Sequence, residues 1–272
     1  MQKHKVFAED YNRDEEGRVL FPRDTDLRAY LFPFTDPSEH VAKANMHAVR
    51  ELVKLVSEEG ETVLDPFGGT GTILVALLDK RKVLMIELEE HFQKTIESNI
   101  KGAGTVVPKA DELAMLIPGD CNKILPLPPG LFHHMIFSPP YSNLLKKGEN
   151  IKNDKTSVDL GYGSAALYTA HPDNIGKLSD FIYFQKMERV YKKFYDSLPV
   201  GGTMTIIIKD RMIAGKRIFL GKRAERDCNR IGFETVAWNK WFALGGGYSA
   251  INRAMGLETV NEEDLITLRR VS

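Results

Sequence analysis

Two short segments of this sequence hold residues whose types and spacing could do chemistry. The first is the glycine-rich stretch Asp65–Thr72, with glycines at positions 68, 69 and 71. Glycines at a turn between a strand and a helix let backbone amides approach a ligand at the positive end of the helix, which suits a phosphate or a carboxylate. The competing interpretation is a glycine turn needed only for packing.

Two common nucleotide-binding patterns do not fit this stretch. A dinucleotide-binding fingerprint that began at Gly69 and Gly71 would need glycine or alanine at position 74, but this residue is a leucine. The phosphate-binding P-loop needs Gly-Lys-Ser or Gly-Lys-Thr, and neither occurs in the chain. The stretch therefore indicates a different ligand.

The second segment is Ser138–Tyr141, with the sequence Ser-Pro-Pro-Tyr, directly after an apolar run that ends in Phe137. Two consecutive prolines give a stiff backbone without N–H groups, and their carbonyls are left to point outward beside an aromatic ring. A planar amino group fits such a place. A simple turn is the alternative, but ligands of open α/β sheets bind at the carboxyl ends of strands, which favours a site.

The elements around these segments alternate between strand and helix. Asp36 can cap a helix that continues to Gly60, because Pro37 suits its first turn and Glu39 takes the capping-box position. Alternation of this kind predicts an α/β fold with a parallel sheet. In the first half, we expect strands at 61–66 and 82–87, and helices at 73–78 and 89–100.

The second half of the chain continues the alternation around one long irregular region. Residues 142–179 have weak periodicity, so we expect a loop or insertion there, and loops of this length are usually functional. The last segment, 264–271, alternates like an edge strand. The other expected elements are strands at 113–119, 133–137, 204–208 and 233–238, and helices at 180–197 and 216–231, the latter basic.

Together the two motifs resemble the S-adenosyl-L-methionine-dependent methyltransferases that modify exocyclic amino groups of DNA bases, and the resemblance covers most of residues 30–270. It implies a Rossmann-like class I methyltransferase fold: a mostly parallel seven-stranded sheet with an antiparallel edge strand. It also implies an extension at 1–35, a methyltransferase domain at 36–272 and a target-binding insertion at 142–179. The residues that match the cofactor loop of the family are Asp65, Pro66, Phe67, Gly68, Gly69, Thr70, Gly71 and Thr72.

The resemblance assigns further cofactor residues. Glu87 matches the acid that accepts hydrogen bonds from the ribose hydroxyls, with Glu89 and Glu90 as competitors. Asp120 matches the acceptor for the adenine amino group, with a backbone amide from Cys121, although a turn aspartate is the alternative. His40 and Lys43 look like a third cofactor element, in which the usual proline after the histidine is replaced by Val41.

The resemblance makes Ser138, Pro139, Pro140 and Tyr141 the catalytic motif. An exocyclic amino nitrogen is a weak nucleophile and is buried in a base pair, so the base must be flipped out of the duplex. Tyr141 can stack on the extruded base, while Ser138 and the Pro139 carbonyl accept the amino hydrogens and aim the nitrogen at the sulfonium methyl. Such a transfer needs neither a metal ion nor a covalent nucleophile.

Several targets remain open. Serine at the first motif position favours cytosine N4, and adenine N6 is the alternative. A cytosine-C5 enzyme would need a Pro-Cys nucleophile, whereas Cys121 and Cys228 both follow aspartate. A tRNA guanine-N2 enzyme usually has an added amino-terminal RNA-binding domain, for which we expect too little room, and a glutamine methyltransferase more often has Asn-Pro-Pro-Tyr. The non-enzyme alternative is a DNA-recognition subunit that binds cofactor without turnover.

Charge does not mark the whole chain as a nucleic-acid-binding protein. It has 37 basic and 37 acidic residues, hence no net charge, but residues 209–230 hold eight basic residues against three acidic ones. A solvated helix face competes with a phosphate-binding patch there. The candidates for contacts with DNA are Arg211, Lys216, Arg217, Lys222 and Arg223, with Lys146 and Lys147 in the loop and Arg253 near the carboxyl end.

The remaining expectations concern the setting of the protein. Two cysteines are too few for a disulfide framework, and the charged amino terminus and the short apolar runs argue against a signal peptide or a membrane span. We therefore expect a cytoplasmic protein that acts on double-stranded DNA. The sequence leaves open whether it is a monomer or a homodimer, and whether a restriction endonuclease accompanies it in a restriction-modification system.

Overall fold

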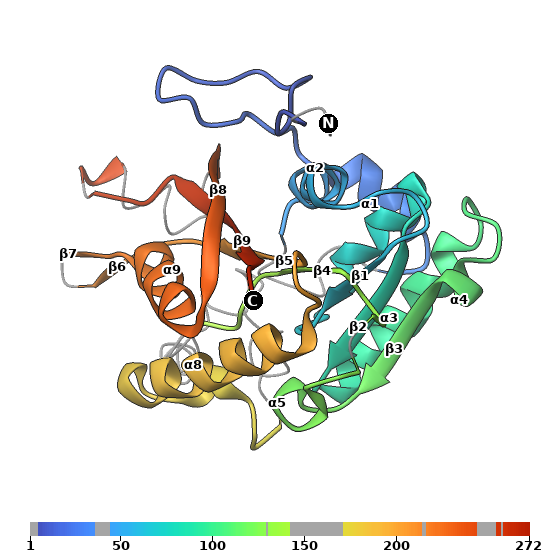
Figure 1. Cartoon of the computed structure of the whole chain (residues 1–272). Coiled ribbons are helices and arrows are strands. Elements are labelled where there is room, and N and C mark those ends of the chain that lie inside the picture. Colours follow the sequence, from blue (N-terminus) through green and yellow to red (C-terminus); the bar gives the residue numbers. More distant parts are fainter. Residues whose placement is uncertain are drawn as a thin grey trace, which may run out of the picture.

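A seven-stranded sheet organises the chain in the computed structural model, which describes residues 5–35, 44–128, 130–141, 171–213, 216–243, 254–256 and 258–272 (Figure 1). The strand order is β3-β2-β1-β4-β5-β9-β8. The five strands from β3 to β5 pair in parallel, and β9 is antiparallel to both of its neighbours. The strands are β1 Thr62–Asp65, β2 Lys82–Glu87, β3 Ala114–Pro118, β4 His134–Phe137, β5 Thr203–Ile208, β8 Phe233–Phe242 and β9 Glu262–Arg270.

Helices cover both faces of this sheet. In β2, Val83 and Met85 face one buried cluster while Leu84 and Ile86 face the other, as expected for a parallel strand buried on both sides. Figure 1 shows α8 and α9 together on one face, with α1 and α2 on the other. The helices are α1 Thr25–Leu31, α2 Met46–Val56, α3 Glu90–Ala103, α4 Ala110–Leu113, α5 Cys121–Ile124, α8 Asp180–Ser197 and α9 Leu220–Ile231, with 3-10 helices η2 Thr72–Asp79 and η4 Ile175–Lys177.

The predicted fold class is confirmed: the protein is α/β, with a Rossmann-like, mostly parallel seven-stranded sheet in which the pairing at the β9–β8 edge is antiparallel. The prediction that the last strand is the outermost one is wrong, because β9 lies between β5 and β8. Residues 264–268 are all buried, because β9 is paired on both sides and the alternation in its sequence does not mark an exposed face. The segment 73–78 forms the predicted helix, but with 3-10 geometry.

Helix α2 begins at Met46, inside the range predicted as one helix. Asn45, in an extended conformation, caps α2 by accepting hydrogen bonds from the amides of His47 and Ala48. The helix predicted from Asp36 to Gly60 therefore does not run continuously, since the backbone is not helical at residues 44–45 and α2 ends at Val56. The proposed cap at Asp36, like His40 and Lys43, lies outside the described residues.

The basic helix is also shorter than predicted. Residues Lys216–Ile218 form strand β7, which pairs with β6, Arg211–Ile213, in an antiparallel hairpin that leads into α9. Phe219 precedes the first turn of α9, and the Asp210 carboxylate accepts hydrogen bonds from the Leu220 and Gly221 amides. This carboxylate fixes the start of the helix four residues after Lys216.

Part of the segment predicted to form an extension, 1–35, contributes to the domain core. Phe7, Val19 and Leu31 belong to the same buried cluster as β1. Val19 donates to the Lys240 carbonyl and accepts from the Phe242 amide, so it adds a short pairing beside the end of β8. The boundary at 35/36 stays a prediction, and this segment stabilises the sheet in either case.

A buried carboxylate joins the amino-terminal segment to the hairpin and the outer strands. Glu262, at the start of β9, accepts from Arg217 and Lys240 at 2.7 Å each and from Arg18 at 3.3 Å. Its side chain is 11% exposed. Burial alone would raise the pKa of Glu262, but the three cations outweigh burial and hold that pKa at about 2.

This network predicts acid sensitivity. A lowered pKa means that ionised Glu262 stabilises the fold fully above its ordinary pKa and that this stabilisation is lost as pH falls towards 2. We expect Glu262→Gln to lower the free energy of unfolding at pH 7 by about 2 kcal/mol, since three cations lose their acceptor. Urea unfolding at pH 7 and pH 3 measures both effects. An equal pH dependence in the wild type and in E262Q would contradict the assignment.

Across the described residues, no helix is long and apolar enough to cross a membrane.

Candidate active site

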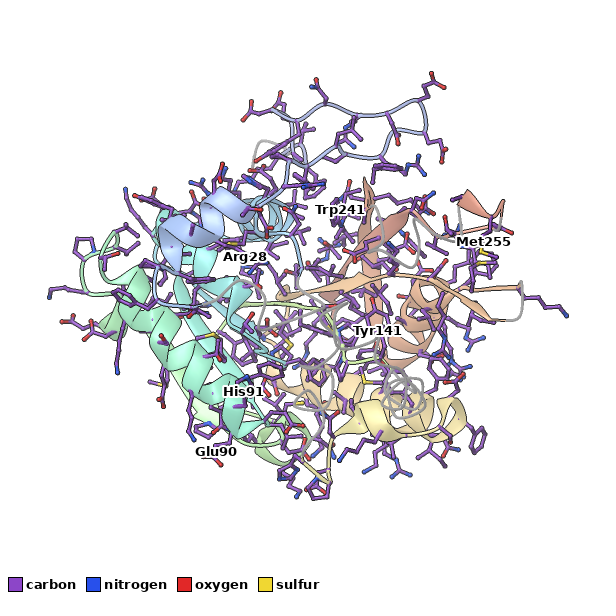
Figure 2. The ribbon with its side chains drawn as sticks, turned by 180° about the vertical axis from the view of Figure 1, so that it is seen from behind. Arg28, Glu90, His91, Tyr141, Trp241 and Met255 are labelled. Atoms are coloured by element: carbon purple, nitrogen blue, oxygen red, sulfur yellow. The ribbon has the colours of Figure 1, made fainter. Side chains whose placement is uncertain are left out.

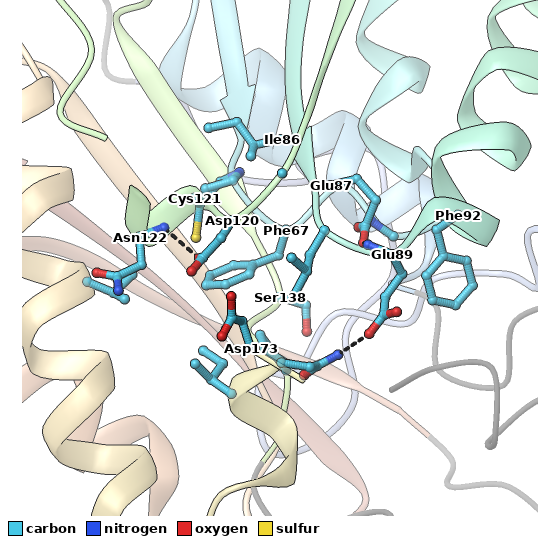
Figure 3. A pocket seen from close by; sticks show the side chains of 18 residues that line it. Phe67, Ile86, Glu87, Glu89, Phe92, Asp120, Cys121, Asn122, Ser138 and Asp173 are labelled. Carbon is cyan, nitrogen blue, oxygen red and sulfur yellow. Dashed lines mark hydrogen bonds between the residues drawn. The ribbon is translucent and has the colours of Figure 1, made fainter. Parts of the chain in front are cut away.

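The carboxyl ends of β1, β2, β3 and β4 surround a cavity, here named the β2 cavity (Figure 3). Its walls come from the glycine loop, the end of β2, the turn after β3, the segment after β4 and the turn at 173–175. Several residues with a predicted binding or catalytic role line this cavity: Pro66, Phe67, Gly69, Glu87, Asp120, Cys121, Ser138 and Pro140. The topology thus gathers residues that lie far apart in the sequence.

A second cavity, here named the β4 cavity, lies on the other side of the glycine loop, towards α2. Phe67, Gly69 and Ser138 line both cavities, so the two meet at the glycine loop and the first residue of the Ser-Pro-Pro-Tyr segment. The predicted site residues that line the β4 cavity are Asp65, Phe67, Gly68, Gly69, Thr70, Thr72, Ser138, Pro139 and Tyr141.

The glycine loop needs its glycines for conformation and close approach. Gly69 and Gly71 have φ angles of +53° and +79°, where other residues are strained. A β-carbon on Gly68 would lie 3.1 Å from Ile96 Cδ1 and 3.4 Å from the Ile86 carbonyl oxygen. Gly71 lines neither cavity and instead caps η2.

Glu87 holds this loop from the end of β2. Its carboxylate accepts from the Gly69 amide at 2.6 Å and from the Glu89 amide at 2.8 Å. Burial, with a smaller contribution from the nearby charge of Glu89, raises the pKa of Glu87 to about 7. A carboxylate that can be protonated near neutral pH, and that faces a cavity, is a typical feature of a binding site.

Asp65 forms a second buried acid, at the end of β1. It accepts a hydrogen bond from the Phe67 amide at 2.9 Å. Burial raises the pKa of Asp65 to about 7; the nearby charge of Glu87 also raises this pKa, and the hydrogen bond from Phe67 lowers it in part. Two carboxyls with raised pKa values therefore lie on either side of the glycine loop.

Asp120 begins α5 after β3. Its Oδ1 accepts from the Asn122 amide at 2.8 Å, as in Figure 3, so the alternative of an aspartate that shapes a turn describes part of its role. Cys121 is buried, and burial raises the pKa of its thiol far above the ordinary value. A thiol in this state is not a nucleophile.

The Ser-Pro-Pro-Tyr segment follows β4 directly. Tyr141 is half-buried, and its hydroxyl accepts a hydrogen bond from the Lys209 amide at 2.8 Å, just after the end of β5. This bond ties the ring to the neighbouring strand. Tyr141 lies near the centre of the molecule in Figure 2.

Sequence reasoning missed part of the β2 cavity wall. Glu89 was considered only as a competitor of Glu87, yet both acids line the cavity, whereas Glu90 pairs with Lys94 at the surface. Asn174 lies 85 residues further along the chain, and its side-chain amide donates to Glu89 at 2.8 Å. The one available signal was the Asn-x-Gly spacing of an Asx turn, which is common in loops. The other lining residues without a predicted role are Ile86, Leu88, Phe92, Gly119, Asn122, Asp173, Ile175 and Val190.

The predicted DNA-binding cations differ in how they are held. Arg217 is paired with Asp210 and Glu262, Arg211 with Asp180, and Arg223 with Asp227. Lys216 and Lys222 are exposed, on the hairpin and the first turn of α9. Lys146, Lys147 and Arg253 lie outside the described residues, as does the predicted insertion up to residue 170.

Comparison with known proteins agrees with this geometry. Residues 6–98 match a family described as DNA methylase, the N6/N4 methyltransferases. The match includes the glycine loop and Glu87 but ends before Asp120 and Ser138–Tyr141. It supports an amino-methyltransferase. No curated protein matches the chain.

Solved structures share the fold at low sequence identity. A methyltransferase from Pyrococcus furiosus superposes with a TM-score of 0.54 and 13% identity over 92% of this chain and 95% of its own. The [4+2]-cyclase SpnF gives 0.54 and 11% over 84% and 81%. The glycopeptide N-methyltransferase MtfA, complexed with S-adenosyl-L-homocysteine, gives 0.50 and 12% over 92% and 99%. The fold is thus that of Rossmann-like methyltransferases.

Proposed function

We propose that this chain is an S-adenosyl-L-methionine-dependent DNA methyltransferase that modifies the exocyclic amino group of a flipped-out base, with cytosine N4 as the favoured target. One observation carries the proposal: Phe67 and Ser138 line both the cavity that holds the predicted cofactor acids and the cavity that holds Tyr141. A methyl donor in the first cavity and an amino group beside Ser138 would then be neighbours.

The β2 cavity fits this cofactor chemically. Each carboxylate oxygen of Glu87 accepts one backbone amide and keeps a second lone pair for a ribose hydroxyl. Asp120 Oδ1 accepts from Asn122, and its Oδ2 can accept from an adenine amino group. Phe67, Phe92 and Ile175 supply apolar walls. The MtfA structure with S-adenosyl-L-homocysteine, on the same fold, further supports this type of ligand. The cofactor supplies an electrophilic methyl group on a sulfonium centre.

The protein would orient the amino group through three residues. Ser138 Oγ and the Pro139 carbonyl accept its two hydrogens, which withdraws the nitrogen lone pair from the ring and aims it. The Tyr141 ring, held through the Lys209 amide, stacks on the base. Because the Cys121 and Cys228 thiols are buried, with pKa values raised by burial, covalent attack of the cytosine-C5 type is disfavoured.

A methyl-transfer assay tests the proposal. Duplex DNA, tRNA and a protein mixture would each be incubated with methyl-labelled cofactor, and nucleosides from digested DNA would be separated by liquid chromatography against authentic standards. We expect label in duplex DNA, as N4-methylcytosine. N6-methyladenine alone would transfer the assignment to adenine, and label in tRNA alone would replace DNA as substrate. Binding of DNA and cofactor with no transfer would indicate a recognition subunit without turnover.

The exposed lysines should contribute to the affinity for DNA. Lys216 and Lys222 follow the end of β5, at the same edge of the sheet as Ser138. The slope of log K against log salt is negative, and each phosphate contact that is lost makes it less steep by roughly 0.9. We expect Lys216→Ala with Lys222→Ala to make it less steep by about 2, measured by fluorescence anisotropy between 50 and 200 mM salt.

A matched control removes two lysines elsewhere. Lys80 follows η2 and pairs with Glu59, and Lys192 pairs with Asp196 in the later turns of α8. The double variant Lys80→Ala and Lys192→Ala removes the same charge and should leave the slope unchanged. Equal slopes for the two double variants would mean that net charge, not this patch, sets the affinity.

A further inference from the structure

The turn at residues 171–177 lies between the β2 cavity and the Ser-Pro-Pro-Tyr segment. On one side, Asp173, Asn174 and Ile175 line the cavity (Figure 3). The proposed reaction needs cofactor and base to be placed together, so a segment that contacts both sites is of interest.

Three contacts hold the cavity side of this turn. Glu89, 4% exposed, accepts from the His171 amide at 3.0 Å and from the Asn174 side chain at 2.8 Å. Lys123, on α5, pairs with Asp173 at 2.5 Å. The Glu89 amide donates to the carboxylate of Glu87, two residues earlier. The turn is therefore linked, through Glu89, to the acid predicted to bind the ribose.

The other side of the turn contacts the catalytic motif. Asn174 Oδ1 accepts from the Gly176 amide at 2.9 Å and so fixes the turn internally. At Gly176, a β-carbon would lie 3.3 Å from the Tyr141 carbonyl oxygen and 3.7 Å from Pro140 Cβ. The backbone of the turn therefore packs against Pro140 and Tyr141. A continuous path of contacts joins Glu87 to Tyr141 through Glu89, Asn174 and Gly176.

We infer that Glu89 and Asn174 are positioning residues that couple cofactor binding to placement of the target base. A cofactor that orders Glu87 and Glu89 also orders the turn, and through it the segment on which the base stacks. By linkage, DNA must then strengthen cofactor binding by the same factor. This inference rests on the proposed function.

The coupling factor is the readout. If Glu89 and Asn174 had a merely structural role, their replacement would weaken the binding of each ligand but would leave the coupling factor unchanged. The Kd of S-adenosyl-L-homocysteine would be measured by calorimetry with and without duplex DNA. The Kd of duplex DNA would be measured with and without S-adenosyl-L-homocysteine. In the wild type we expect a factor of about ten in both directions, within the usual range of allosteric coupling.

Two variants break the path at different points. Glu89→Gln keeps the shape but removes the charge and replaces one of the two accepting oxygens by an amide nitrogen, which weakens the contacts with His171 and Asn174. Asn174→Ala removes the link to Glu89 and to Gly176 altogether. Both should bring the coupling factor to within about twofold of one. Glu90→Gln is the matched control, since Glu90 is exposed and pairs with Lys94 (Figure 2), and it should keep the wild-type factor.

The outcomes separate this inference from the proposed function. If Glu89→Gln and Asn174→Ala fold, as judged by thermal unfolding, and keep the wild-type factor, the inference is wrong while the function stands. If one variant fails to fold, the other decides. If the wild type transfers methyl groups to DNA but shows no coupling, the inference also fails. If the wild type binds no DNA at all, it is the proposed function that fails.

Discussion

Replacing Tyr141 by alanine is expected to lower kcat/KM for DNA by about 100-fold, with cofactor affinity within about threefold of the wild type. Base-aromatic stacking contributes roughly 1–3 kcal/mol per base, and the same ring also orients the amino group. Tyr141 lines the β4 cavity and not the β2 cavity, so its loss leaves the predicted cofactor contacts intact. Steady-state methyl transfer and calorimetry with S-adenosyl-L-homocysteine measure the two quantities.

The phenylalanine variant separates the ring from its hydroxyl. Tyr141→Phe keeps the stacking surface and loses the hydrogen bond from the Lys209 amide. Such a loss costs about 1 kcal/mol, so we expect a decrease of roughly fivefold. Equal loss in both variants would show that the anchoring bond, rather than stacking, is what matters. A large loss of cofactor affinity in Tyr141→Ala would place the ring in the cofactor site.

The fold alone would not have led to a methyltransferase. The cyclase SpnF has the same TM-score to this chain as a methyltransferase from Pyrococcus furiosus. What favours amino methylation is the site: carboxylates at the ends of β1 and β2, and Ser-Pro-Pro-Tyr at the end of β4. Function has to be argued from such groups, because one fold supports many reactions.

Local sequence signals were enough for the central strands and their loops. Strand β2 was predicted at its observed bounds, Lys82–Glu87, and α8 at Asp180–Ser197, because both have clear apolar periodicity and clear ends. The order of the parallel strands then brings the glycine loop, Glu87 and Ser138 together. The proximity of these segments could therefore be predicted from motifs that follow strands, without any knowledge of side-chain contacts.

Features that depend on distant contacts could not be predicted. From the sequence, Glu89 could equally be a surface acid. Its contact with the side chain of Asn174, 85 residues further along the chain, is visible only in the structure. Residues 218–220, directly after Lys216 and Arg217, include no helix-breaking residue. Lys216 and Arg217 nevertheless form a strand, which pairs with β6, and Asp210 and Glu262 hold Arg217. Asn45 caps α2, whereas the sequence pattern predicted a cap at Asp36.

Glu87→Gln is expected to weaken cofactor binding by about 10- to 100-fold. Hydrogen bonds to a charged group contribute about 1.5–3 kcal/mol, and the glutamine side chain would retain one acceptor where the carboxylate has two. The Gly69 amide also loses a charged acceptor, so part of the loss reflects a less ordered glycine loop. Calorimetry with S-adenosyl-L-homocysteine at pH 8 measures the change.

The raised pKa of Glu87 makes the same contact dependent on pH. In the free protein that pKa is about 7, because burial disfavours the charged form, whereas two hydroxyl donors would require the carboxylate to be ionised. Cofactor binding should therefore release a proton, and affinity should fall up to tenfold per pH unit below 7 while changing little above 8. For the free protein the sign is opposite: because the native state holds its proton up to pH 7, stability falls as pH rises from about 4.5 to 7.

Asp65 has a similarly raised pKa, so it supplies the control. Asp65→Asn should keep most of the pH dependence of cofactor affinity, since Asp65 lines the β4 cavity, and Glu87→Gln should abolish it. Titrations in two buffers of different ionisation enthalpy give the number of protons released at pH 7. If Glu87→Gln releases as many protons as the wild type and Asp65→Asn releases none, then Asp65 is the titrating acid, and the pH dependence of cofactor binding arises at the end of β1.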